Sequence, residues 1–108
     1  MGTYHLTNKA VEDLSNIWNY TVETWSERQA DLYYEMLIGF CQDIADSPAI
    51  GKRYDGIAGD LYGFRANKHV IFYRAISRDK IEVVRILHGK MDLKSRIREM
   101  RYLCSEAT

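Results

Sequence analysis

Basic side chains gather near the ends of apolar segments in the second half of the chain. They are Arg65, Arg74 and Arg85, with His88 three positions after the last arginine. Guanidinium groups bind phosphates and carboxylates through paired hydrogen bonds, and an imidazole gains or loses a proton near neutral pH. This pattern predicts docking on phosphates, nucleic acid or an acidic partner.

These residue types also occur in sites that cleave RNA through attack of a 2′-hydroxyl. Such a site needs a general base, a general acid and cations that converge on one pocket. His88 is the best acid–base candidate here. Side chains alternate along a regular strand, which places Arg85 on the face of Ile81 and Val83 and places His88 with Ile86. Regular alternation therefore predicts that the arginine and the histidine diverge, which argues against nuclease chemistry.

Arg85 lies among apolar neighbours, where an unpaired charge is costly. We expect its guanidinium either to pair with Asp92 or Glu82 or to reach a partner. Either arrangement keeps the arginine ionised.

The two cysteines fit no metal-binding or redox motif. Cys41 and Cys104 are far apart, and the chain has no CxxC pair. We expect two reduced thiols, with Cys41 in the core because it falls on the apolar stripe of a predicted helix. The sequence predicts no metal and no other cofactor.

Two helices and three strands must position these residues. The apolar positions from Val11 to Trp25 recur at spacings of three and four, after a cap at Thr7 or Asn8, and predict an amphipathic helix with Trp18 in the core. A second helix begins near Ser26 and ends before residues 47–48, because the proline at 48 disfavours helix in its predecessor. The two helices should form an antiparallel hairpin.

The remainder of the chain is strand-rich. Segments 61–65, 69–76 and 81–88 predict an antiparallel meander, and a brief opening strand at 4–6 is expected at an edge. Residues 49–59 read as a loop and 92–103 as a short basic helix. We therefore predict one α+β domain over residues 1–108, with an N-terminal strand, an antiparallel helical hairpin packed on a small antiparallel sheet, and a short C-terminal helix.

Charge divides the chain into two halves. Residues 1–54 hold 4 basic and 8 acidic residues, whereas residues 55–108 hold 11 basic and 7 acidic ones. An acidic or phosphate-bearing partner is therefore expected at the second half. No apolar run approaches the roughly 20 residues of a membrane span, and residues 1–7 lack the regions of a secretion signal, so we expect a cytoplasmic protein without a membrane partner.

The residues that fill this order resemble the ParE branch of the ParE/RelE toxin superfamily. The resemblance depends on the segment from Tyr4 to Ala30, on Pro48 with Gly51, and most specifically on the run 69–74 followed by 85–88, Met91 and Asp92. It spans about 90 residues in the right order and spacing. The fold expected from the resemblance is that of the RelE/ParE-like toxins.

The resemblance implies the toxin of a type II toxin–antitoxin pair. Such a protein would inhibit DNA gyrase by binding, trap the cleaved DNA and block replication, and a ParD-like antitoxin would neutralise it. It would not be an enzyme and would act on no small-molecule substrate. The alternative is a RelE-type ribosome-dependent mRNA endoribonuclease, and a third possibility is a binding module that has lost toxicity.

Two surfaces are predicted from these considerations. The residues expected to face gyrase, with or without its bound DNA, are Arg65, Arg74, Arg85, His88, Met91, Asp92 and Trp25. Aromatic and methionine side chains on the helices exceed what one apolar stripe needs, which is typical of a recognition groove. The residues expected to bind the antitoxin are Tyr20, Tyr33, Tyr34, Met36 and Leu37.

Overall fold

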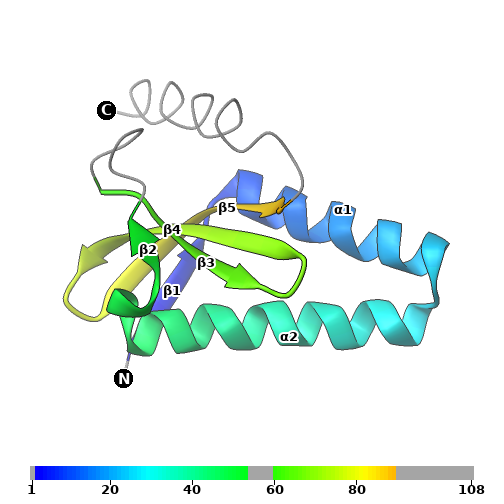
Figure 1. Ribbon diagram of the computed structural model, residues 1–108, viewed down its shortest axis with the longest axis horizontal. Coiled ribbons are helices and arrows are strands. Elements are labelled where there is room, and N and C mark those ends of the chain that lie inside the picture. Colours follow the sequence, from blue (N-terminus) through cyan, green and yellow to red (C-terminus); the bar gives the residue numbers. More distant parts are fainter. Residues whose placement is uncertain (1, 54–59, 90–108) are drawn as a thin grey trace.

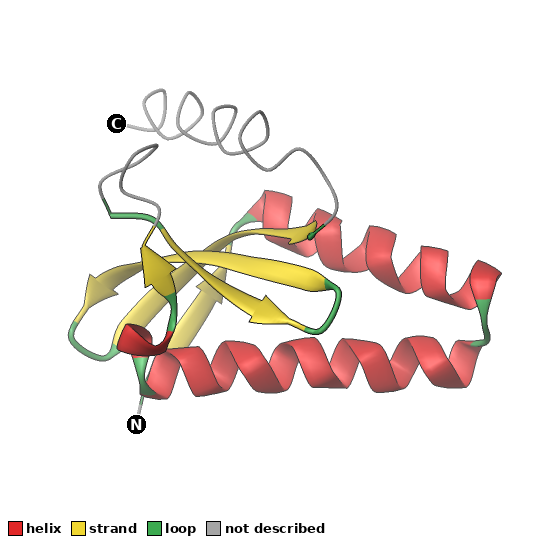
Figure 2. Cartoon of the chain, viewed as in Figure 1, coloured by secondary structure: helices red, strands yellow, loops and turns green. Residues whose placement is uncertain are grey.

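The structure, a computed structural model, describes residues 2–53 and 60–89 of the chain. Its elements are β1 (Thr3–Leu6), α1 (Asn8–Thr24), α2 (Glu27–Asp46), the 3₁₀ helix η1 (Pro48–Ile50), β2 (Lys52–Arg53), β3 (Tyr62–Ala66), β4 (His69–Ser77) and β5 (Lys80–His88). Figure 1 shows α1 and α2 as an antiparallel pair beside a twisted sheet, and Figure 2 separates the two layers by colour. The predicted α+β fold with a helical hairpin on a sheet is confirmed.

Side-chain caps start both helices. The Thr7 hydroxyl accepts a hydrogen bond from the Ala10 N–H at 3.1 Å, and the Ser26 hydroxyl accepts one from the Gln29 N–H at 3.1 Å. These bonds satisfy amide groups that have no partner inside the helix. The predicted cap at Thr7 and the predicted start at Ser26 are confirmed. None of the described helices combines the length and apolar character of a membrane span.

The sheet has the strand order β1-β5-β4-β3-β2. Strands β3, β4 and β5 form the predicted antiparallel meander, and the opening strand β1 lies at an edge, also as predicted. However, β1 runs parallel to β5, so the prediction of a wholly antiparallel sheet is wrong. Parallel strands need a long connection, and the one between β1 and β5 contains both helices and the strands β2, β3 and β4. The short strand β2 lies in the segment predicted as loop.

A bulge in β5 changes which side chains share a face. Phe72 is opposite Arg85, while the next residue of β4, Tyr73, is opposite Val83, so Val84 is an extra residue. The prediction that Arg85 shares a face with Ile81 and Val83 is therefore wrong. Arg85 and His88 still alternate as predicted, because they pair with Phe72 and His69, which are three residues apart in β4. Both residues nevertheless line one cavity, so the prediction that they do not share a pocket is wrong.

The core lies between the helical pair and one face of the sheet. Its buried members are Ala10, Leu14, Leu37, Cys41, Ile44, Ala45, Ala66, Ile71, Tyr73, Ile81, Val83 and Ile86. Cys41 is buried as predicted, and burial raises its thiol pKa to about 11. Trp18 is half-buried and its indole N–H donates to Asp31 at 3.0 Å, so the prediction of a core position for this residue is wrong. The predicted helix at 92–103 falls outside the described residues.

Candidate functional site

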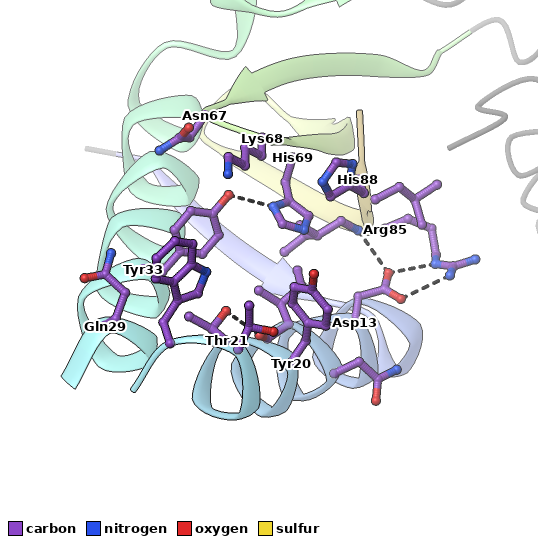
Figure 3. Close-up of a pocket in the computed structure, with 16 residues that line it drawn as sticks. Asp13, Tyr20, Thr21, Gln29, Tyr33, Asn67, Lys68, His69, Arg85 and His88 are labelled. Atoms are coloured by element: carbon purple, nitrogen blue, oxygen red, sulfur yellow. Dashed lines mark hydrogen bonds and ion pairs between the residues drawn. The ribbon is translucent and has the colours of Figure 1, made fainter. Parts of the chain in front are cut away.

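A cavity of about 820 Å³ opens between the joined ends of the helices and one end of the sheet. Its lining comes from every layer of the fold: Asp13, Asn16, Ile17, Tyr20, Thr21 and Thr24 of α1, Trp25 of the link, Gln29 and Tyr33 of α2, Asn67, Lys68 and His69 around the β3–β4 turn, and Arg85, Ile86, Leu87 and His88 of β5. Figure 3 shows these side chains converging from the helices and the sheet. Segments far apart in the sequence therefore build one site.

Helical spacing explains the α1 side of the cavity. Its six lining residues recur at spacings of three and one, so they form one continuous face of the helix. Gln29 and Tyr33 are four residues apart and share a face of α2 in the same way. The face of α1 that carries Tyr20 thus points into the cavity, although this tyrosine is not part of the core.

Two large aromatic side chains at the cavity remain accessible to solvent. Tyr20 is 66% exposed and Trp25 is 71% exposed. Exposed rings of this size are costly to leave in water and are enriched at binding sites, where they supply contact area with little loss of conformational entropy. The expectation that Trp25 lies on the surface near the turn between the helices is met.

Three ring side chains form the inner wall. The Tyr33 hydroxyl lies 2.6 Å from Nδ1 of His69, and the rings of His69 and His88 pack edge to face with centroids 5.1 Å apart. Burial lowers the His69 pKa to about 4, with further lowering by His88 and Lys68 and an opposing effect of Asp13. His69 is therefore uncharged at neutral pH. With its proton on Nε2, Nδ1 accepts the Tyr33 O–H.

Asp13 fixes the end of β5 against α1. Its carboxylate accepts hydrogen bonds from the Arg85 guanidinium at 2.8 and 3.0 Å and from the Ile86 N–H at 3.0 Å. The two charged side chains are only 12% and 13% exposed. Strand β1 pairs only with residues 80–83 of β5, so the backbone of Ile86 lies on an edge that no strand covers. Asp13 accepts the hydrogen bond of this uncovered N–H group.

Arg85 lines the cavity but is engaged by Asp13, so its contact with gyrase stays a prediction. The guanidinium is bound by Asp13, and the Arg85 side chain is 13% exposed. Glu82 instead binds Arg74 at 3.1 Å, on a part of the sheet that is more exposed to water. Asp92 and Met91 fall outside the described residues.

Two further cations lie at the cavity end of the sheet. Arg65 and Lys68 are exposed, and no carboxylate pairs with either of them within residues 2–53 and 60–89. The Gly89 N–H donates to the Lys68 carbonyl at 2.8 Å. A Cβ atom at Gly89 would lie 3.0 Å from a guanidinium nitrogen of Arg65, so the absence of a side chain lets the arginine lie against this turn. Lys68 was missed as a site residue, because the sequence indicated only a turn at this position.

The predicted antitoxin-binding residues divide into three groups. Tyr20 and Tyr33 line the cavity. Tyr34 is 41% exposed but lies outside the lining, and Met36 is half-buried against the core. Leu37 is fully buried, which leaves it no surface for a partner, so its inclusion is wrong. The helical spacing of Asn16, Tyr20 and Thr24 was the signal that would have identified the cavity face of α1.

The arrangement is suited to binding flat or amide-bearing groups. Exposed rings, side-chain amides and cations surround one cavity, whereas the one carboxylate among its described lining residues is bound to Arg85 and to the Ile86 N–H. Within the described part of the chain, no group of three or more histidine, cysteine, aspartate or glutamate side chains has the geometry of a metal site. Apolar rings with a few polar groups around them are the usual lining of a binding cavity, in which the polar groups set the orientation of a ligand.

Comparison with known proteins identifies the family. Residues 4–93 match the family described as the ParE toxin of the type II toxin–antitoxin system, parDE. The chain belongs to the ParE toxin family. It is therefore the toxin component of a type II toxin–antitoxin system, as the sequence resemblance predicted.

Individual relatives and a solved structure agree with this assignment. Toxin ParE1 of Caulobacter vibrioides is 30% identical over 97 residues, which cover 90% of this ParE chain and 99% of that protein. Toxin ParE1 of Mycobacterium tuberculosis is 34% identical over 90 residues, which cover 83% and 92%. A chain in the structure of the chromosomal ParDE toxin–antitoxin system from P. aeruginosa has the same fold, with a TM-score of 0.69 and 16% identity over 82% of this chain and 96% of that one.

Proposed function

We propose that this ParE toxin inhibits DNA gyrase by binding and without catalysis, and that a ParD-like antitoxin neutralises it by covering the cavity. Membership of the ParE family supports the toxin role. The single observation that carries the binding role is the exposure of Tyr20 and Trp25 at a preformed cavity. Because gyrase acts on chromosomal DNA, the toxin would work in the cytoplasm.

The gyrase-facing surface would consist of the accessible cations and rings at one end of the molecule. It retains the predicted residues Arg65, Arg74, His88 and Trp25 and adds Lys68. Positive charge at this end suits a complex in which gyrase holds DNA. Arg74 would contribute at the periphery, because Glu82 already offsets much of its charge.

The antitoxin would bind the rings around the same cavity. Tyr20 and Tyr33 line it, and Tyr34 and Met36 extend the surface along α2. Residues 8–46 contain eight acidic and two basic residues, so a basic segment of the antitoxin would complement the outside of the helical pair. Occupation of one cavity by the antitoxin would exclude gyrase directly.

A supercoiling assay tests the proposal. Purified toxin is added to gyrase and relaxed plasmid, and the products are examined for lost supercoiling and for linear DNA. Trp25→Ala is expected to raise the toxin concentration for half-inhibition about tenfold or more, as for a well-packed interface tryptophan. The matched control is Leu32→Ala, which truncates another exposed apolar side chain, 53% exposed, outside the cavity lining.

The RelE-type alternative is tested beside it. The observation in its favour is that His69, His88 and Tyr33 share the cavity with Lys68, since these residue types serve in acid–base catalysis. Translating ribosomes with a reporter mRNA are incubated with the same toxin preparations. Cleavage of the mRNA together with unaffected supercoiling would replace the gyrase proposal with the nuclease.

A further inference from the structure

We propose that the cavity accepts an unstacked base of single-stranded DNA, with the adjoining phosphates against Lys68 and Arg65. The inference rests on the proposed function, in which the toxin acts on gyrase together with cleaved DNA. It assigns a ligand to the cavity itself, and so makes DNA a direct contact of the toxin. Four features of the described residues carry it.

The first feature is the set of rings. Tyr20 and Trp25 line the cavity with most of their surface accessible, and Tyr33 forms part of the inner wall. Proteins that bind single strands stack bases on such rings, and stacking tolerates any base because every base has a flat face. The base pairs of an intact duplex leave no such face open, so these rings favour an unpaired strand.

The second feature is the set of side-chain amides around the rings. Asn16, Gln29 and Asn67 each line the cavity. An amide side chain provides both hydrogen-bond donors and an acceptor, as the edge of a base requires. The cavity volume of about 820 Å³ falls within the range of sites that hold a small organic group.

The third feature is the local charge. Among the described residues, Asp13 is the only carboxylate in the lining, and it is bound to Arg85 and to the Ile86 N–H. Lys68 is at the cavity wall, and Arg65 lies beside Gly89, whose N–H is bound to the Lys68 carbonyl. The described residues at the cavity end of the sheet therefore carry net positive charge, which attracts phosphates.

The fourth feature is the arrangement of these groups. The cations lie at the β3–β4 turn and the end of β5, whereas Tyr20 and Trp25 lie on the helical side of the cavity. A strand that placed its base between the helices and the sheet would bring its phosphates to the sheet end. An acidic peptide would satisfy the cations but would not need three rings and three amides together. The combination therefore favours a nucleotide chain over a peptide.

Fluorescence anisotropy tests the inference with the full chain and a fluorescein-labelled dT12 strand. We expect binding of dT12, weaker binding of a duplex of the same length, and about tenfold weaker binding of dT12 by Trp25→Ala. Lys68→Gln is expected to reduce the slope of log affinity against log salt by about 1, as for loss of one phosphate contact. The matched control is Lys80→Gln, since Lys80 begins β5 whereas the cavity lies at its other end.

Tryptophan emission gives an independent measurement. In a Trp18→Phe background Trp25 is the only tryptophan, because the chain contains two. Addition of unlabelled dT12 should quench its emission if a base stacks on the ring. Far-ultraviolet circular dichroism of each variant establishes that the fold is retained.

Three outcomes would overturn the inference. One is absence of dT12 binding at toxin concentrations that inhibit gyrase, which would leave the proposed function intact and assign the cavity to protein contacts. Another is binding that neither Trp25→Ala nor Lys68→Gln changes. The third is binding of an rU12 strand more than tenfold tighter than dT12, which would assign the cavity to RNA. Conversely, binding of dT12 without inhibition of gyrase would support the DNA site while refuting the gyrase target.

Discussion

The buried ion pair between Asp13 and Arg85 provides the most quantitative prediction. Asp13→Ala removes the acceptor of two guanidinium hydrogen bonds and of the Ile86 N–H. Removing one partner of a buried pair costs about 3–5 kcal/mol, and the residual exposure of 12–13% favours the lower end of that range. We therefore expect the free energy of unfolding to fall by about 3 kcal/mol, a large part of the total for a domain of this size.

Urea denaturation measures this loss. With an m value of about 1.5 kcal/mol/M, a loss of about 3 kcal/mol lowers the midpoint by about 2 M. Arg74→Ala is the control, because it breaks the more exposed pair with Glu82, and we expect a loss below about 1 kcal/mol.

A double-mutant cycle isolates the pair. Asp13→Ala, Arg85→Ala and the double variant should give a coupling free energy above about 1 kcal/mol, since the two residues are in direct contact. A loss below about 1 kcal/mol for Asp13→Ala, or additive effects in the double variant, would refute the view that this pair holds the end of β5 to α1.

Three further predictions concern other buried groups. Tyr73→Phe removes a hydroxyl that donates to the Pro48 carbonyl at 2.6 Å and accepts from the Gly51 N–H at 3.0 Å. We expect the free energy of unfolding to fall by about 1–3 kcal/mol and the melting temperature in calorimetry to fall by at least about 4 °C. An unchanged melting temperature would contradict this prediction. Because the His69 pKa falls from 6.5 to about 4 on folding, the unfolded chain binds the proton first, and stability should decrease as the pH falls from 6.5 to 4. His69→Gln should reduce this pH dependence of the urea midpoint, and an identical slope in both proteins would show that another group causes it. Cys41 is buried and its thiol pKa is raised to about 11, so we expect it to react with iodoacetamide at pH 8 only after unfolding. The measurement uses a Cys104→Ser background, and rapid labelling of the native protein would exclude a buried thiol.

Local signals in the sequence were sufficient to predict β1, the two α-helices and strands β3, β4 and β5 in their order. The cap residues Thr7 and Ser26 mark helix starts because they act on amides three residues away. The turn at Asn67 is equally local, since its φ of 59° is a backbone conformation that asparagine tolerates better than most residues. Such features depend on neighbours in the chain, which the sequence displays directly.

The features that escaped prediction depend on contacts between distant segments. Asp13 and Arg85 are 72 positions apart, so the sequence offered nearer carboxylates such as Glu82 as partners for the arginine. The bulge at Val84 breaks the regular alternation of β5, and no glycine or proline within that strand indicates it. These two facts together explain why Arg85 binds Asp13 and why only 13% of its side chain is exposed.

The candidate site was predicted in its residue types and only partly in its geometry. Tyr20 and Trp25 were assigned to different partners from the sequence, yet both line one cavity. Lys68 joins them because the β3–β4 turn reaches the helical side of the molecule, which local patterns do not reveal. The cavity is therefore a property of how the helical pair meets the sheet.

Titration of gyrase with the toxin tests most directly whether inhibition arises from binding alone. Gyrase is held at a concentration well above the dissociation constant, and the remaining supercoiling activity is measured as toxin is added. Binding predicts a linear decrease that ends at a fixed molar ratio of toxin to gyrase, unchanged by longer incubation. Complete inhibition by far less than one toxin per gyrase, with activity declining further over time, would contradict a binding mechanism and indicate turnover.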